Sequence, residues 1–134
     1  MSETRSKRWL EGAYNTIWQK GKIFSTKMNK EIIYRSSWEK KFIEYMDGNQ
    51  DIVSFKEDPF RIEYFYDQKR NYIPDFLVEY KNGNKELIEI KPEAFKKYKR
   101  NKLKFAAGRQ YCKQNGLKYR VLTEKYLRYI GLDI

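Results

Sequence analysis

The sequence lacks the side chains on which much of enzymology depends. Its 134 residues include no histidine and a single cysteine, Cys112. A Ser-His-Asp or Cys-His relay requires an imidazole, and a Cys/His zinc site requires several such ligands. No disulfide can close within the chain, which suits a reducing cytoplasm. Any catalysis must therefore rest on carboxylates, lysines and a hard metal ion.

Long apolar runs are also missing. The mean hydropathy is −0.94, and no stretch approaches the ~20 apolar residues that span a bilayer. The first thirty residues contain no uninterrupted apolar segment typical of a signal peptide. We therefore expect no membrane insertion. Aromatic residues make up 17% of the chain, and because each can bury about 150–250 Å², we expect a folded core.

Acidic residues are scarce relative to basic ones. The chain carries 29 Lys and Arg against 18 Asp and Glu, a net charge of +11 at pH 7. Such a surplus indicates a polyanionic partner, with nucleic acid first and an anionic membrane surface second.

The first thirty residues differ from the rest. Apolar side chains recur there at helical spacing among basic ones: Trp9, Leu10, Ala13, Tyr14, Ile17 and Trp18. This spacing predicts an amphipathic helix, followed by a basic linker over residues 21–30. We therefore expect a basic N-terminal helical arm, residues 1–30, and one domain, residues 31–134. The helix either packs on that domain or contacts DNA or a partner.

From residue 33 onward the pattern predicts an α/β fold. Ser36 or Ser37 can cap a helix that runs to about Asp47, and a long helix over residues 93–114 stops at Gly116. Strands are expected over residues 52–57, 60–66, 72–80, 86–91 and 119–122, with a hairpin turn at Asn82-Gly83 and a last helix after Thr123. Because the fifth strand arrives through a helical crossover, the sheet must be mixed.

Glu39 stands on the apolar side of the first predicted helix. On a helical wheel it falls between Met46 and Ile43, where an unpartnered carboxylate is costly. One interpretation is a capping box in which Glu39 bonds back to the amide of Ser36. The other is a functional carboxylate, and both stay open at this point.

The fourth predicted strand carries an acid and a base on one face. Alternate residues of a strand share a face, so Leu87, Glu89 and Lys91 project together while Ile88 and Ile90 pack on the other side. Taken alone, this pattern also fits a solvated face with an ion pair.

Asp75 lies across the hairpin turn from this strand. A turn with an even number of residues would pair Asp75 with Ile90 and turn it away from Glu89, whereas an odd or bulged turn places both carboxylates on one face. We predict the odd or bulged turn. Two converging carboxylates need a cation, and oxygen ligands without histidine favour Mg²⁺ or Mn²⁺.

These elements together resemble a nuclease superfamily. The motif of PD-(D/E)XK nucleases resembles three features of this sequence: a helix carrying Glu39, then Pro74-Asp75, then Glu89-Ile90-Lys91. The predicted order of elements is helix, three-stranded meander, helix, strand, and it resembles their restriction-endonuclease-like core. The stretches YRSSWEK (34–40) and KYRVLTE (118–124) resemble head-completion nucleases of contractile-tailed phages. Residues 72–92 resemble the endonuclease subunit of heteromeric transposases. The resemblance covers residues 33–132.

The resemblance implies roles for individual residues. Asp75 and Glu89 would bind Mg²⁺ or Mn²⁺, the main-chain carbonyl of Ile90 would add a ligand, and Glu39 would hold the ion directly or through water. Lys91 would orient the attacking water and offset charge at the phosphate. Some relatives carry a glutamine on the helix after the motif lysine. Gln110 lies in that region, and its role stays open.

A run of basic residues directly follows the motif lysine. The cations we expect to contact DNA phosphates are Lys96, Lys97, Lys99, Arg100, Lys102, Lys104 and Arg109, together with Arg35. No acid lies between Glu93 and Glu124, whereas a merely soluble helix usually interleaves both signs. A solvated helix face is the alternative interpretation.

The sequence therefore predicts a Mg²⁺-dependent DNA endonuclease in a phage head-completion setting. One alternative is a mobile-element nuclease, either a free-standing homing endonuclease or a transposon end-cleaving subunit. Another is a non-catalytic nucleic-acid-binding or virion structural protein. Double-strand cleavage by one site would require a homodimer or two successive nicks. In these settings we expect a phage capsid or transposase partner. We also expect a cytoplasmic location, which for a phage protein is the host cytoplasm, or association with the virion.

Overall fold

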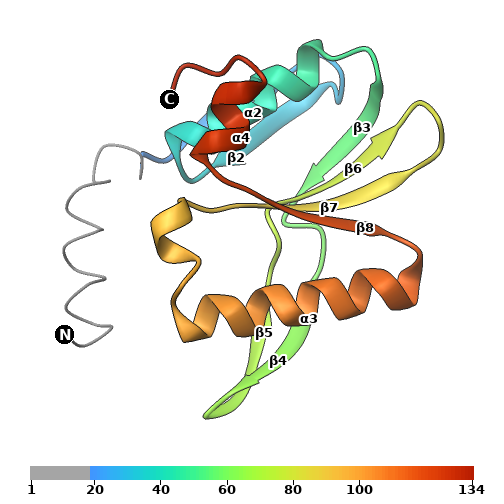
Figure 1. Ribbon diagram of the computed structural model, residues 1–134. Coiled ribbons are helices and arrows are strands. Elements are labelled where there is room, and N and C mark those ends of the chain that lie inside the picture. The colour runs from blue at the N-terminus through green and yellow to red at the C-terminus, as the bar shows by residue number, and fades with distance from the viewer. Residues whose placement is uncertain (1–18) are drawn as a thin grey trace.

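A four-stranded mixed sheet lies at the centre of the computed structural model, which describes residues 19–134 (Figure 1). Its strands, in spatial order, are β3 (Ile52–Glu57), β6 (Phe76–Tyr80), β7 (Lys85–Ile90) and β8 (Lys118–Leu122). The β3–β6 and β6–β7 pairs are antiparallel, whereas β7 and β8 are parallel. The crossover between β7 and β8 contains helix α3 (Lys99–Asn115). The predicted α/β class with a mixed sheet is confirmed.

Helices and a hairpin cover the two faces of this sheet. Figure 1 shows α2 (Ser37–Gly48) and α4 (Glu124–Tyr129) on one side, and α3 with the hairpin of β4 (Ile62–Tyr66) and β5 (Gln68–Tyr72) on the other. Strand β7 serves both cores, because Ile88 and Ile90 pack on the α2 side and Leu87 packs on the α3 side. No helix within residues 19–134 is both long and apolar enough to span a membrane.

Helix α2 begins, and helix α3 ends, where the capping residues predict. The Ser36 hydroxyl accepts a hydrogen bond from the amide of Glu39 at 3.1 Å and starts α2. Residue Gly116, in the left-handed conformation at φ 67°, ends α3, a position that favours glycine. The helix predicted over residues 93–114 is divided: a 3-10 turn, η2 (Glu93–Phe95), precedes α3.

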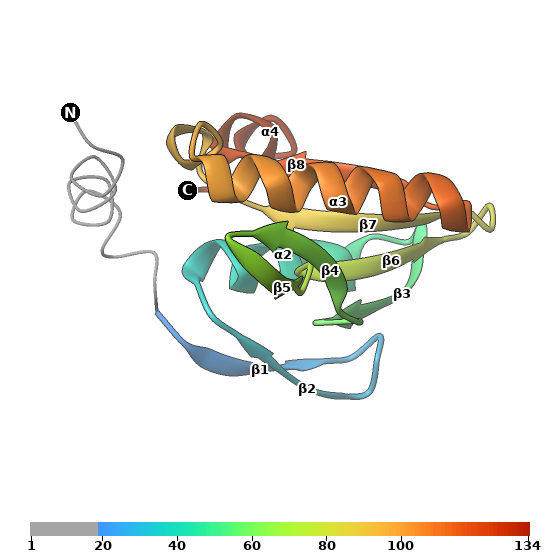
Figure 2. The same cartoon turned by 90° about the horizontal axis from the view of Figure 1, so that it is seen from below.

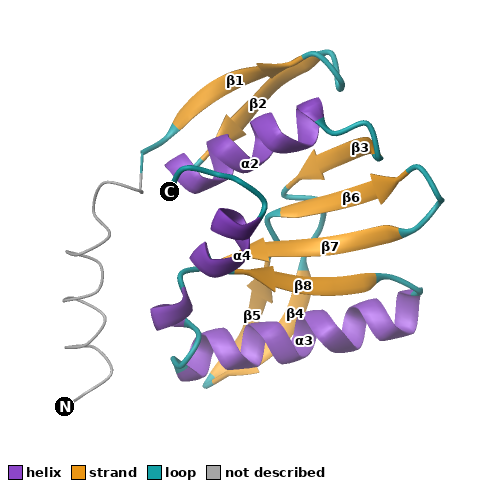
Figure 3. Cartoon of the chain, turned by 45° about the horizontal axis from the view of Figure 1, so that its top comes forward, coloured by secondary structure: helices purple, strands orange, loops and turns teal. Residues whose placement is uncertain are grey.

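The basic linker predicted over residues 21–30 is wrong. Strands β1 (Gly21–Ser25) and β2 (Lys30–Tyr34) form an antiparallel hairpin that lies on the β3 side of the sheet, against α2 (Figures 2 and 3). The hairpin joins the core because Ile32 is fully buried in the cluster around α2. The predicted boundary at residue 30 falls at the start of β2, and the amphipathic helix of residues 1–18 lies outside the described residues.

The strands predicted over residues 60–66 and 72–80 also require correction. Strand β4 begins only at Ile62, and the second segment is broken into β5 and β6 by residues 73–75. The reason is Pro74, which has no N–H to continue a ladder of hydrogen bonds. β4 and β5 instead form a separate hairpin, turned at Asp67 with φ 63°. The meander in the central sheet is therefore β3, β6 and β7.

Candidate active site

The β6–β7 hairpin places Asp75 and Glu89 on one face. Phe76 pairs with Ile88, so the turn holds an odd number of residues, as predicted, and Gly83 adopts φ 89° within it. Continuing this register by one residue sets Asp75 opposite Glu89. Directly opposite residues project to the same side of a sheet, and the two carboxylates therefore converge.

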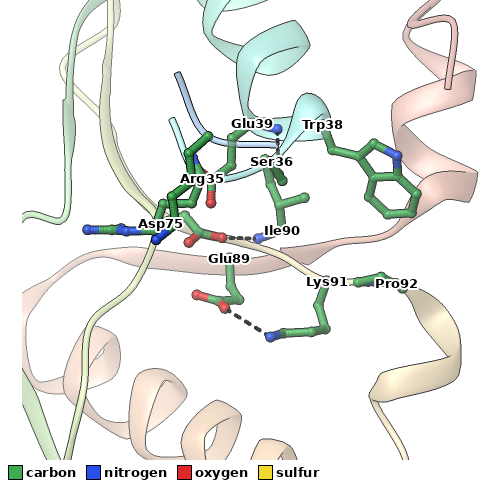
Figure 4. Close-up of a pocket in the computed structure, with 10 residues that line it drawn as sticks. Arg35, Ser36, Trp38, Glu39, Asp75, Glu89, Ile90, Lys91 and Pro92 are labelled. Carbon is green, nitrogen blue, oxygen red and sulfur yellow. Dashed lines mark hydrogen bonds and ion pairs between the residues drawn. The ribbon is translucent and has the colours of Figure 1, made fainter. Parts of the chain in front are cut away.

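Both carboxylates line one pocket of about 300 Å³. The pocket draws its residues from the position just before β6, from the end of β7 and the two residues after it, from α2, and from the segments before β1 and α2 (Figure 4). Its lining consists of Lys20, Arg35, Ser36, Trp38, Glu39, Asp75, Glu89, Ile90, Lys91 and Pro92. The structure thus brings together all five residues that the sequence analysis assigned to catalysis or metal binding.

Asp75 is anchored to the neighbouring strand. Its Oδ2 atom accepts a hydrogen bond from the amide of Ile90 at 2.7 Å. The N–H and C=O of one residue in a strand point to the same edge, so the Ile90 carbonyl faces the side on which Asp75 lies. Loss of hydration and the negative charges of Glu89 and Glu39 raise the pKa of Asp75 well above its usual range.

Glu89 is held from two directions. Only 6% of it is exposed; its Oε1 atom accepts a hydrogen bond from the Tyr72 hydroxyl at 2.9 Å, and its Oε2 atom lies 3.9 Å from Lys91 Nζ. Burial raises the pKa of Glu89, although the Lys91 charge and the Tyr72 hydrogen bond oppose that rise. Burial also raises the pKa of the Tyr72 hydroxyl.

Glu39 combines the two interpretations that the sequence left open. It does bond back across the helix start, but its Oε2 atom accepts from the amide of Arg35, at 2.7 Å, and not from that of Ser36 as a capping box predicts. The same side chain lines the pocket, and burial raises its pKa. Glu39 is therefore a cap and a pocket carboxylate at once.

The donor set fits a hard divalent cation. After burial, the charges of Glu89 and Glu39 raise the pKa of Asp75, and the charge of Glu39 adds to the rise at Glu89. A cation would relieve this repulsion, and the Ile90 carbonyl supplies a further oxygen. Within residues 19–134, no three acidic, cysteine or histidine side chains form a ready-made metal cluster. Asp75, Glu89 and the Ile90 carbonyl would hold an ion with water completing its shell, and Glu39 would contact the ion directly or through water.

The predicted phosphate-binding cations are spread over α3 and the turns before it. Lys96 pairs with Glu93 at 3.8 Å, Lys97 lies over the Tyr98 ring, and Arg100 donates to the Tyr64 hydroxyl at 3.2 Å. The residues Lys99, Arg100, Lys102 and Arg109 are exposed on α3, as is Gln110. None of these lines the pocket.

Two of the predicted cations lie close to the carboxylates. The positive charge of Lys104 on α3 acts on Glu89 and opposes the rise of its pKa. Arg35 lines the pocket and pairs with Asp58 at 2.8 Å. Residues 91–98, which include η2, connect the carboxyl end of β7 to the start of α3, so the basic helix directly follows the motif strand in the chain (Figure 3).

The sequence analysis missed the tyrosines behind the pocket. Tyr72 contacts Glu89, and its hydroxyl lies 2.9 Å from that of Tyr119 on β8. Lys20 was missed as a pocket residue as well. One signal was available for this region: Gly108 inside a predicted helix, since an isolated helical glycine costs stability unless a neighbour packs closely against it.

Comparison with known proteins assigns the chain. The model of the TnsA-like endonuclease N-terminal domain matches residues 49–124, which extend from the start of β3 to the end of β8 and include Asp75, Glu89 and Lys91. The chain belongs to the TnsA-like endonuclease family. This endonuclease is also 31% identical to the head completion nuclease of Enterobacteria phage T4, in an alignment 127 residues long that covers 76% of this chain and 85% of that protein. Membership confirms the predicted restriction-endonuclease-like superfamily and fold. Glu39 lies outside the matched range.

Proposed function

We propose that the protein is a metal-dependent DNA endonuclease that hydrolyses phosphodiester bonds. The observation that carries the proposal is the β6–β7 register, which brings Asp75 and Glu89 to one face of the sheet with Lys91 beside them. A protein that only binds polyanions has no use for three acids gathered in one pocket beside its basic surface. The net charge of +11 favours DNA as the substrate.

The residues of the pocket divide the work of hydrolysis. Asp75, Glu89 and the Ile90 carbonyl would bind Mg²⁺ or Mn²⁺, with Glu39 in contact directly or through water. Such an ion, when bound, lowers the pKa of water and offsets charge on phosphate oxygens. Lys91 lies 3.9 Å from Glu89, from where its ammonium group orients a water molecule and compensates the charge that develops on the phosphate.

The basic helix α3 supplies the DNA contacts. Its exposed residues Lys99, Lys102, Arg109 and Lys113 recur three, seven and four positions apart, which places them along one side of the helix. Phosphate contacts of this kind position a duplex without reading its sequence. We therefore expect DNA to lie along α3, with its backbone entering the pocket beside β7.

The biological setting we favour is phage head completion. The T4 relative supports it, because the alignment covers 85% of that protein. The TnsA-like match supports transposon end cleavage as the second candidate. In the first setting the partner is a capsid component, and in the second it is another transposase subunit.

Plasmid nicking tests the enzymatic proposal. Wild-type protein is expected to nick supercoiled DNA with Mg²⁺ and to stop in EDTA, whereas Asp75→Ala binds the same plasmid without nicking it. Glu63→Ala, which removes an exposed acid on β4, serves as the matched control and nicks normally. Wild-type protein that binds but cuts no supercoiled, linear or branched DNA would overturn the proposal in favour of a basic binding or virion protein.

A further inference from the structure

Two tyrosine hydroxyls form a hydrogen-bonded chain that ends on Glu89. The Tyr72 hydroxyl donates to Glu89 Oε1 at 2.9 Å and lies 2.9 Å from the Tyr119 hydroxyl. A phenol carries one proton, and Tyr72 directs its own to Glu89. Tyr119 is therefore the donor in the second bond. The two hydrogen bonds connect β8 and the end of β5 to the motif strand β7.

These hydrogen bonds orient the Glu89 carboxylate relative to Lys91. Because Tyr72 holds Oε1, the Oε2 atom is the one that lies 3.9 Å from Lys91 Nζ. A carboxylate oxygen that accepts one hydrogen bond keeps a second lone pair, so both oxygens stay competent to bind a cation. Tyr72 is 2% exposed and its ring packs in the cluster with Leu87 and Cys112. Its hydroxyl consequently has one fixed position.

Helix α3 is shaped to receive the second tyrosine. A Cβ atom at Gly108 would lie 2.5 Å from Cε1 and 2.6 Å from Cζ of Tyr119, which is far inside van der Waals contact. Glycine in a helix interior costs about 1 kcal/mol relative to alanine. The space left by Gly108 is what lets the Tyr119 ring lie against α3 with its hydroxyl on Tyr72.

We propose that Tyr72 is a positioning residue for Glu89, and that Tyr119, accommodated by Gly108, fixes the Tyr72 hydroxyl. The proposal rests on the proposed function, in which Glu89 binds a divalent cation, and extends it to residues with no chemical step of their own. Partners that orient metal-binding side chains typically contribute 10–100-fold in metal affinity or activity. We expect an effect of that size from Tyr72.

The test replaces each hydroxyl and measures Mn²⁺ affinity by calorimetric titration, alongside steady-state cleavage. Tyr72→Phe keeps the ring and its packing, and is expected to bind Mn²⁺ about 10–100-fold more weakly, with a lower kcat and an unchanged KM for DNA. Tyr119→Phe is expected to shift Mn²⁺ affinity in the same direction by a smaller factor, because Tyr72 still donates to Glu89. Gly108→Ala, which displaces the Tyr119 ring, follows Tyr119→Phe.

Tyr80→Phe is the matched control. The Tyr80 hydroxyl donates at 2.6 Å to Glu86, another buried acid of β7 that points to the opposite face from Glu89. Removing it likewise costs a tyrosine hydrogen bond to a buried acid of β7 but is expected to leave Mn²⁺ affinity and kcat unchanged. Equal Mn²⁺ affinity in wild type and Tyr72→Phe, or an equal loss in Tyr80→Phe, would overturn the positioning role alone.

The outcomes separate this proposal from the proposed function. Wild-type protein that binds Mn²⁺ at the pocket but cuts no DNA contradicts the enzymatic function, while the affinity difference between wild type and Tyr72→Phe still decides the role of Tyr72. Wild-type protein that binds no Mn²⁺ at all contradicts both.

Discussion

Single side chains in this site serve structure and chemistry together. Glu39 satisfies the Arg35 amide at the start of α2 and also lines the pocket with Asp75. A carboxylate is well suited to both tasks, since one oxygen accepts the backbone hydrogen bond and the other remains available. The question that the sequence left open, cap or functional acid, is therefore decided by substitutions that separate charge from hydrogen bonding.

Glu39→Gln and Glu39→Ala make that separation. The glutamine oxygen can still accept from Arg35 and the buried charge is removed, so Glu39→Gln should be at least as stable as wild type. Glu39→Ala should be about 1 kcal/mol less stable than Glu39→Gln, because a helix cap is lost. Both should cleave at least roughly tenfold more slowly, measured by nicking at saturating DNA. Wild-type cleavage by Glu39→Gln would reduce Glu39 to a cap.

The site residues that can be predicted from the sequence are those related to one another by spacing within one local element. Asp75, Glu89 and Lys91 were found because strand alternation and turn parity relate residues within one hairpin. Tyr72 was not found, because its contact with Glu89 depends on the break at Pro74, which turns β5 out of the sheet. Tyr119 depends on a parallel pairing across the α3 crossover, which no local pattern reveals.

At the scale of elements, one carboxylate ties the β1–β2 hairpin to α2. Asp47 accepts hydrogen bonds from the Ser25 hydroxyl at 2.5 Å and the Lys27 amide at 3.0 Å. Burial opposes the ionised form, but the bonds from Ser25, Lys27 and Thr26 lower the pKa of Asp47 overall. Because the pKa of Asp47 is lower in the folded than in the unfolded protein, its carboxylate stabilises the fold at pH values above its unfolded pKa, near 4. This stabilisation is lost as the pH falls through the pKa of the folded protein.

Asp47→Asn should therefore destabilise the protein in a pH-dependent way. At pH 7 we expect a loss of about 1–3 kcal/mol in the unfolding free energy, since hydrogen bonds to a charged group are removed. At a pH below the lowered folded pKa of Asp47, the difference from wild type should largely disappear. Urea unfolding at both pH values measures it, and a constant difference would show that the carboxylate charge has no part in docking the hairpin.

Helix α3 acts as a single electrostatic element. If about five of its cations neutralise phosphates, log K for duplex DNA should fall with log salt at a slope of about −4 to −5. Lys102→Ala should flatten that slope by about one, whereas Lys125→Ala on α4, on the other face of the sheet, should not change it. Fluorescence anisotropy across a salt series measures both, and equal slopes for all three proteins would remove α3 from the interface.

The elements themselves were predictable to different degrees. Helix α2, strand β7 and the Asn82-Gly83 turn carry caps, alternation and turn residues that act locally, and each was located correctly. The sequence pattern predicts a linker in place of the β1–β2 hairpin, because basic residues surround the paired Ile23 and Ile32 and the burial of Ile32 depends on distant α2. The β4–β5 hairpin is not predicted, because β5 is polar over residues 68–71, which the pattern leaves between the strands expected over residues 60–66 and 72–80.

At the scale of the whole molecule, the metal-free protein carries an electrostatic cost. The pKa values of Glu39, Asp75 and Glu89 are all raised, with burial as the first cause. A carboxyl whose folded pKa exceeds its unfolded value, near 4, destabilises the fold increasingly as the pH rises above that unfolded value. The pH dependence of stability that these three carboxyls cause is therefore opposite in sign to that caused by Asp47.

Asp75→Asn isolates this cost. In EDTA its Tm should exceed that of wild type by a margin that grows as the pH rises above the unfolded pKa near 4. Added Mn²⁺ should reverse the order, because binding at a hundredfold excess over Kd stabilises wild type by about 2.7 kcal/mol, while the variant loses a ligand. Calorimetric melting curves test both parts, and a variant stabilised by Mn²⁺ as much as wild type would place the ion elsewhere.

The gathering of Asp75 and Glu89 around a divalent ion is tested most directly by anomalous X-ray diffraction from crystals grown with Mn²⁺ and a DNA duplex. We predict an anomalous peak bounded by the Asp75 and Glu89 carboxylates and the Ile90 carbonyl, with a phosphate beside Lys91. A peak at any other place, or an empty pocket with the duplex bound along α3, would contradict the assignment of this pocket as the cleavage site.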